Sequence, residues 1–115
     1  MSAFYRVSFT SANNEDLRQA FALASEAGSP VDLTGASLRM GLADLSGAAR
    51  LEASTGNGRV TITNAANGSF ELLIPASLMG TLPEGIYRHD MVLAMAGRTQ
   101  RIWTGTLSLA QGVTQ

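Results

Sequence analysis

The residues of this sequence whose types most suggest chemistry are the adjacent pair His89 and Asp90, within LPEGIYRHDMVL (82–93). A histidine and a carboxylate are two members of a Ser-His-Asp relay. The alternation around them predicts a strand, however, and adjacent strand residues point to opposite faces, so these side chains cannot form the hydrogen bond that the relay needs. No G-x-S-x-G motif supplies a nucleophile. We therefore predict no catalytic residue and interpret His89 as a partly buried histidine at the mouth of a strand.

Two further stretches contain residue types that bind metals or phosphates. Asp32, in PVDLTGA (30–36), is a candidate calcium ligand, but calcium needs several converging oxygens and Asp44 is the only other acid in nearby loops. An aspartate that accepts from backbone amides ahead of LTG is the simpler interpretation. The glycine-rich TGNGR (55–59) lacks the Lys-Ser/Thr of a P-loop and indicates a flexible turn. The sequence predicts neither a metal nor a cofactor.

The same stretch that holds His89 predicts a structural corner made by Gly85, Tyr87 and Asp90. Tyr87 follows the turn residues PEG, which fits a tyrosine corner, in which the hydroxyl bonds a backbone carbonyl upstream. We expect Asp90 to cap the backbone or to pair with Arg88 or Arg101.

Composition limits the classes of protein to which the chain can belong. Its 115 residues suffice for one domain with its own core, and we expect a single domain over 1–115. It has no cysteine and no lysine, and its eight arginines are scattered rather than clustered, which argues against nucleic acid as a partner. The sequence contains no apolar run long enough to predict a membrane span, and MSAFYRVSFT lacks the pattern of a signal peptide. We expect synthesis in a bacterial cytoplasm and no contact with membrane.

Alternation of apolar and polar residues predicts that almost the whole chain is β. Turn residues separate the alternating runs about every ten residues, which is typical of a sandwich or barrel. The predicted strands are 4–10, 17–25, 36–44, 58–63, 69–75, 86–95 and 98–110. The run 17–25 also contains good helix formers, but its small alanines favour a sheet face. A helical turn is expected at 75–82, and Asn67-Gly68 predicts a hairpin because both residues tolerate positive φ.

The last two strands form a hairpin whose register the side chains can decide. A two-residue loop would pair Met91 with Ile102, whereas a three-residue loop pairs Met91 with Trp103 and Tyr87 with Leu107. The second register brings the large apolar groups together, and we prefer it, with a bulge near residues 97–98. Arg101 then shares the face of Trp103. We expect the core to contain Phe21, Leu38, Met40, Phe70, Leu72, Tyr87, Met91, Trp103 and Leu107.

The segments GSPVDLTGASLRMGLAD, NGSFELLIP and LPEGIYRHDMVLAMAGRTQRIWTGTLSL, with a closing GVT, occur in this order over roughly residues 15–114. In this order they resemble small immunoglobulin-like domains of tailed-phage virions, and in particular the N-terminal domain of phage baseplate upper proteins. The resemblance implies an immunoglobulin-like antiparallel β-sandwich of seven to eight strands that anchors or decorates parts of a virion without catalysis.

That resemblance implies a tail, baseplate or fibre-attachment subunit that contacts other virion proteins within a symmetric oligomeric assembly. Baseplate proteins continue into attachment segments, whereas this sequence stops at the end of the domain, so capsid decoration or a neck position stays open. A carbohydrate-binding adhesion module on the same fold is a further alternative. With seven aromatic residues, most of them at core positions, the chain offers little material for stacking sugars.

Both ends of the chain carry features expected of contact strands. MSAFYRVSFT places Phe4 on one face and Tyr5 on the other, and AQGVTQ, which contains Val113, has no charged side chain. Edge strands of soluble monomers are usually protected by charge, proline or bulges. We therefore predict Phe4, Tyr5 and Val113 as assembly contacts made by strand addition.

Overall fold

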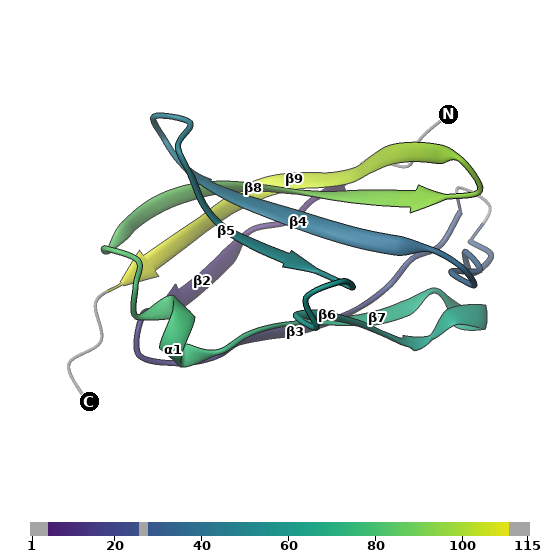
Figure 1. Cartoon of the computed structure of the whole chain (residues 1–115), viewed down its shortest axis with the longest axis horizontal. Coiled ribbons are helices and arrows are strands. Elements are labelled where there is room, and N and C mark those ends of the chain that lie inside the picture. The colour runs from purple at the N-terminus through teal and green to yellow at the C-terminus, as the bar shows by residue number, and fades with distance from the viewer. Residues whose placement is uncertain (1–4, 26–27, 111–115) are drawn as a thin grey trace.

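The computed structural model describes residues 5–25 and 28–110, and within these ranges most of the regular secondary structure is strand (Figure 1). The strands are β1 (Tyr5–Arg6), β2 (Phe9–Ala12), β3 (Leu17–Ala22), β4 (Ser37–Asp44), β5 (Ala49–Ser54), β6 (Val60–Asn64), β7 (Ser69–Ile74), β8 (Gly85–Met95) and β9 (Arg98–Ala110). Two short helical segments complete the described chain, the 3-10 turn η1 (Ala65–Asn67) and the α-helix α1 (Ala76–Met79).

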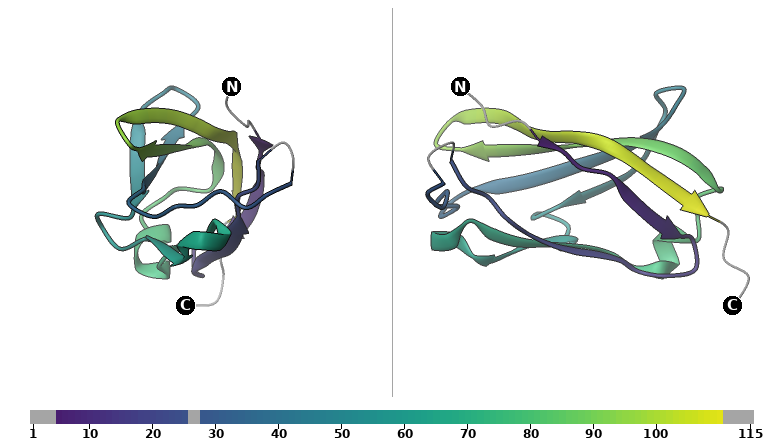
Figure 2. Two further views of the ribbon diagram at one scale, coloured as in Figure 1. Left: turned by 90° about the vertical axis from the view of Figure 1, so that its right-hand side faces the viewer. Right: turned by 180° about the vertical axis from the view of Figure 1, so that it is seen from behind.

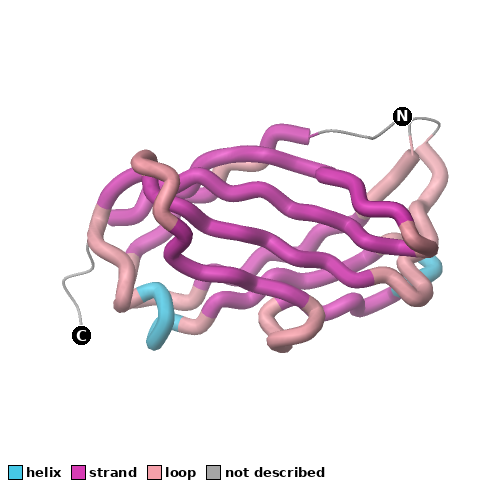
Figure 3. The backbone as a smooth tube through the Cα atoms, turned by 45° about the horizontal axis from the view of Figure 1, so that its top comes forward, coloured by secondary structure: helices cyan, strands magenta, loops and turns pink. Residues whose placement is uncertain are grey.

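The strands form two sheets that pack face to face, as the end-on view in Figure 2 shows. The larger sheet has the order β1-β9-β8-β4-β5, with β2 also paired to β9, and the smaller has the order β3-β7-β6. Figure 3 shows the strands of the larger sheet running side by side across one layer. The strand orders β4-β8-β9 in the larger sheet and β6-β7-β3 in the smaller sheet match the C-F-G and D-E-B strand orders of immunoglobulin sandwiches. The predicted fold class is confirmed.

Two features of this topology differ from the sequence-based expectation. The N-terminal strand is not antiparallel to its neighbour: β1 and β2 both run parallel to β9, with Tyr5 opposite Trp103 and Phe9 opposite Leu107. The edge strand β5 was not predicted at all. Apolar and polar residues do alternate in it, but two of its three apolar residues are alanines and only Ala53 is buried, so the signal is weaker than in the other strands.

The hairpin of β8 and β9 contains both registers that the sequence allowed, and the preferred three-residue loop was wrong. At its tip a two-residue loop of Ala96 and Gly97, both with positive φ, joins Met95 to Arg98. A shift between Met91 and Val92 then changes the pairing. The turn therefore has the backbone of a type I′ hairpin, which requires positive φ at both loop residues.

Beyond the shift, Met91 faces Trp103 and Tyr87 faces Leu107, as predicted. The bulge lies at Ile102, and its expected position near residues 97–98 was wrong. A bulge places one extra residue on one strand, so Ile102 and Trp103 are both buried although they are consecutive. It also turns Arg101 onto the outer face opposite Val92, contrary to the predicted sharing of a face with Trp103.

The core lies between the sheets and centres on Trp103. Its ring lies 4.6 Å from that of Phe21 and 6.0 Å from that of Phe70, centroid to centroid. Of the nine residues predicted for the core, only Phe21 is half-buried; the other eight are buried. Period-two alternation therefore located the core correctly in both sheets.

The connections between strands agree only in part with their predicted form. The hairpin predicted at Asn67-Gly68 is present between β6 and β7; it is closed by η1, and of the two residues only Gly68 takes a positive φ. The helix α1 crosses from the smaller to the larger sheet as predicted, and its first amide, that of Ala76, donates to Asp16 Oδ1 at 2.7 Å.

Candidate functional site

The corner predicted at the start of β8 has the following geometry. The hydroxyl of Tyr87 donates a hydrogen bond to the backbone carbonyl of Pro83, four residues upstream. This is the bond by which a tyrosine corner ties a strand to the turn before it. Gly85 begins the strand with a φ of 149°, a conformation that residues with a side chain rarely adopt. The geometry therefore gives Tyr87 and Gly85 structural tasks.

His89 lies inside the sandwich rather than at the mouth of a strand. Its side chain is 4% exposed, so the expectation of a partly buried histidine at the strand mouth was wrong. The indole Nε1 of Trp103 lies 3.1 Å from His89 Nδ1, and His89 Nε2 lies 3.2 Å from the carbonyl oxygen of Thr106. Because the indole N–H can only donate, Nδ1 must be the acceptor and Nε2 must carry the proton.

This arrangement holds His89 as a neutral ring. Burial lowers its pKa below the ordinary value of 6.5, while the carbonyl of Thr106 and the charge of Asp90 oppose that shift. The ring of Phe9, on the N-terminal strand, stacks on His89 at a centroid distance of 4.9 Å. Through its contacts with Phe9, Trp103 and Thr106, His89 joins β2 to β9 within the core.

Asp90 points to the opposite side of the sheet, as expected for a neighbouring strand residue. Its Oδ2 lies 3.2 Å from Arg101 Nε, so the arginine that the bulge moved outward becomes its partner. The structure thus keeps His89 and Asp90 in different environments, one in the core and one on the surface.

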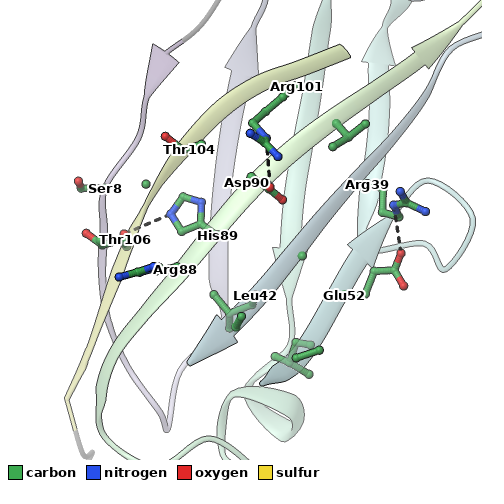
Figure 4. A pocket seen from close by; sticks show the side chains of 16 residues that line it. Ser8, Arg39, Leu42, Glu52, Arg88, His89, Asp90, Arg101, Thr104 and Thr106 are labelled. Atoms are coloured by element: carbon green, nitrogen blue, oxygen red, sulfur yellow. Dashed lines mark hydrogen bonds and ion pairs between the residues drawn. The ribbon is translucent and has the colours of Figure 1, made fainter. Parts of the chain in front are cut away.

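The outer face of the larger sheet is hollowed, and Asp90 lies within this hollow (Figure 4). The hollow has a volume of about 940 Å³. Its floor is formed by small and hydroxyl-bearing residues from three segments of the chain, namely Ser8, Gly41, Ala43, Thr104, Gly105 and Thr106. No prediction from the sequence identified it, because its residues come together only through the pairing of β4, β5, β8 and β9.

Strand pairing orders the outer side chains of the hollow into rows across the sheet. The middle row runs Glu52, Gly41, Asp90, Thr104 from β5 to β9. The next row runs Ala43, Arg88, Thr106. A third row, on the opposite side of the middle row, runs Ser54, Arg39, Val92, Arg101 from β5 to β9.

The charges of the hollow do not balance. Arg39 pairs with Glu52 at 3.6 Å, and Arg101 pairs with Asp90. Arg88 lines the hollow as well, and it has no ion-pair partner among residues 7–25 and 28–110. Three arginines therefore face two carboxylates on this surface, which leaves one positive charge, that of Arg88.

The two aspartates considered as calcium ligands stabilise turns instead. Asp32 Oδ1 accepts from the amide of Thr34 at 2.9 Å and from its hydroxyl at 2.6 Å, and these bonds lower the pKa of Asp32. Asp44 Oδ1 accepts from Ser46 and Ala48 in the β4–β5 turn, and the Ser46 hydroxyl is the first cause that lowers its pKa to about 2. Among the described residues, no group of three or more acidic or histidine side chains could hold a metal ion.

The turn at 55–59 is more ordered than its glycines suggested. The side-chain oxygen of Asn57 accepts from the amides of Ser54 and Arg59, and its amide nitrogen donates to the carbonyl of Glu52. These bonds fix the connection from β5 to β6.

The predicted contacts at the chain ends lie largely outside the described residues. Phe4 and Val113 are not described, and for Tyr5 the structure gives the backbone position only, opposite Trp103 at the edge of the larger sheet. From behind, Figure 2 shows the N-terminal strand lying along β9. The part of the chain that the structure describes contains no helix with the length and hydropathy of a membrane-spanning segment.

Comparison with known proteins gives matches by structure alone. No protein-family model matches the sequence, and no curated protein matches it. The structure is similar to the N-terminal domain of phage TP901-1 ORF48, with a TM-score of 0.54 and 15% sequence identity, over 94% of this chain and 97% of that chain. The expected likeness to a tailed-phage domain is therefore confirmed at the level of the fold.

A second solved structure shows how widely this fold is shared. A chain from a study of multimeric cell-adhesive interactions of VGSC beta subunits has a TM-score of 0.50 and 9% identity, over 91% of this chain and 92% of that chain. At such identities a likeness shows a common fold, and function must be argued from the residues of this chain.

Proposed function

We propose that this domain is a non-enzymatic structural component of a phage or prophage particle, acting through protein–protein contacts as a tail, baseplate or fibre-attachment subunit. One observation carries the proposal: the fold matches a phage domain over nearly the whole length of both chains. Its partners are then other virion proteins in a symmetric oligomeric assembly, and it is made in the bacterial cytoplasm and located in the virion. Capsid decoration or a neck position is the alternative within the same class.

The chemistry of the described residues supports a role without catalysis. His89, the chain's single histidine, has both ring nitrogens hydrogen-bonded inside the core. A general base must reach a substrate proton by direct hydrogen bond or through one water, and this ring is covered by Phe9.

A carbohydrate-binding role has little support in the aromatic residues. Sugar recognition by stacking needs an exposed ring, whereas the described aromatic side chains are buried or, for Phe21, half-buried. They are Phe9, Phe21, Phe70, Tyr87 and Trp103. Protein contacts, which can be made by backbone and polar groups, do not need such a ring.

The N-terminal strand is a suitable place for such contacts. β1 and β2 lie at the edge of the larger sheet and pair on one side with β9. An edge strand offers unpaired N–H and C=O groups to a strand of another molecule. We propose that Phe4, Tyr5 and Val113 contribute the side chains of this contact.

Variants of the chain ends test the proposed contacts. We expect a protein lacking residues 111–115, and one with Phe4→Ser and Tyr5→Ser, to keep the thermal stability of the wild type while entering particles much less often. Leu45→Ser is the matched control, because Leu45 is an exposed apolar residue in the β4–β5 turn, 57% exposed. Full incorporation of both end variants, measured by quantitative mass spectrometry of purified particles, would show that the ends are not the contacts.

A further inference from the structure

A glycine in the middle of strand β4 has no explanation within the described chain. Gly41 has no positive φ, and a Cβ added to it would meet only Asp90 Oδ1, at an ordinary distance of 3.9 Å. Glycine in a strand interior weakens the strand, and it often marks a point where a ligand or another backbone approaches closely. Gly41 therefore indicates that a ligand or the backbone of another molecule approaches strand β4 closely from its outer face.

The other mid-strand glycine of the larger sheet shows what an internal reason looks like. A Cβ on Gly105 would lie 1.5 Å from the carbonyl oxygen of Val7, so the N-terminal strand itself requires glycine there. No described segment covers Gly41 in the same way, and its own position is exposed on the outer face.

Gly41 lies in the floor of the hollow described above, between Glu52 and Asp90. Beside it, the row formed by Ala43, Arg88 and Thr106 contains no acid. The small side chains of Gly41 and Ala43 keep the floor low, and beside it lies Arg88, which has no ion-pair partner among the described side chains. A chain lying across the small residues would bring its side chains directly over this arginine.

We propose that the hollow binds an extended acidic segment of a partner protein. The segment's backbone lies over Gly41 and Ala43, and one of its carboxylates pairs with Arg88. Thr104, Thr106 and Ser8 provide hydroxyls that can bond its polar groups. Arg–carboxylate pairs are strong and directional, which gives the site its preference for an acidic sequence. This inference rests on the proposed function, in that it supplies the protein contact which that function requires.

A peptide titration followed by amide chemical shifts tests the inference. The probe is a capped peptide of alternating serine and glutamate, and the control probe replaces each glutamate with lysine. The glutamate peptide should shift the amides of Gly41, Arg88, Thr104 and Thr106 at low salt, and the lysine peptide should not. Equal shifts with both peptides, shifts confined to other surfaces, or no shift at all would overturn the proposal.

Three variants separate the hollow from general attraction between opposite charges. Gly41→Val adds bulk to the floor where the structure has room for it, and Arg88→Gln removes the unpaired charge. Each should weaken binding of the glutamate peptide by roughly tenfold, while the melting temperature of Gly41→Val does not fall below that of the wild type. Arg98→Gln, at an exposed arginine outside the hollow, should change binding less than roughly twofold. Wild-type affinity in both hollow variants would contradict the proposal.

The peptide experiment uses the isolated chain and needs no particle. If the wild-type protein is present in particles but does not bind the glutamate peptide, this inference alone is refuted. Absence of the protein from particles would refute the proposed function, whatever the peptide does.

Discussion

The indole N–H of Trp103 donates to Nδ1 of His89 across 3.1 Å in the centre of the core, and this bond fixes which nitrogen of the histidine is protonated. The other nitrogen, Nε2, then donates to the carbonyl of Thr106. The pair joins strands β8 and β9 by side chains in addition to their backbone bonds, directly beneath the N-terminal strand that Phe9 anchors.

Two substitutions of Trp103 should separate the contribution of its ring to the free energy of unfolding from the contribution of its N–H group. Trp103→Ala removes the centre of the core and should lower the free energy of unfolding by about 3–5 kcal/mol. Trp103→Phe keeps most of the ring but leaves Nδ1 of His89 without a donor, at a cost of about 1–3 kcal/mol. Denaturant unfolding measures both, and a loss below about 1 kcal/mol for the alanine variant would contradict a central position for Trp103.

Stability should fall with acid because His89 is held neutral. Its pKa in the folded state lies below the ordinary 6.5, so the unfolded chain binds the proton first as pH falls. The stabilisation is complete above pH 6.5 and declines below it, by at most about 1.4 kcal/mol per pH unit, until His89 of the folded state protonates too. The lowered pKa values of Asp32 and Asp44 act in a separate window, below 3.8.

The matched variant for that measurement is His89→Gln, whose amide offers one acceptor and one donor without titrating. Unfolding curves from pH 7.5 to pH 5 should slope for the wild type and be flatter for the variant. Parallel pH profiles would show that His89 is not the group responsible.

Two glycines of the larger sheet should respond to alanine in opposite ways. Gly105→Ala must displace Val7, whose carbonyl oxygen would lie 1.5 Å from the new Cβ, and should cost about 1–3 kcal/mol. Faster hydrogen exchange in β1 and β2 should accompany that loss. Gly41→Ala meets no atom closer than 3.9 Å and should raise stability by about 0.5 kcal/mol. A comparable loss in both variants would contradict the packing of the N-terminal strand over Gly105.

We expect the hydroxyl of Tyr87, which closes the corner at the start of β8, to make a modest contribution to the free energy of unfolding. Tyr87→Phe keeps the buried ring but leaves the carbonyl of Pro83 without its donor, and should reduce the free energy of unfolding by about 1 kcal/mol. Thermal unfolding monitored by circular dichroism measures the effect. An unchanged midpoint would show that water replaces the hydroxyl at no cost.

The sequence predicted those features of the fold that depend on local alternation. Leu38, Met40 and Met91 were assigned to the core because each lies on the apolar side of an alternating run, and the structure buries all three. The pairing of Met91 with Trp103 followed from the size of the two side chains. The bulge at Ile102 could not be foreseen, because an extra residue within a strand breaks the period on which the prediction depended.

The features that were missed depend on contacts between distant segments. The parallel pairing of β2 with β9 brings Phe9 onto His89, and only this packing explains why a lone histidine is buried. Strand β5 alternates, but two of its three apolar residues are alanines, which give only a weak hydrophobic signal. The hollow needs β4 to lie between β5 and β8, and nothing in a single strand marks Gly41 as its floor.

The central claim is that this domain is a structural part of a phage particle, and the most direct test is its presence in such particles. Particles should be purified from a phage stock or induced lysogen that carries the gene, and their proteins quantified by mass spectrometry. The account predicts that the chain is found in a fixed ratio to the other particle proteins, and that it stays bound through density-gradient purification. Its absence from intact, infectious particles of that phage would contradict the account.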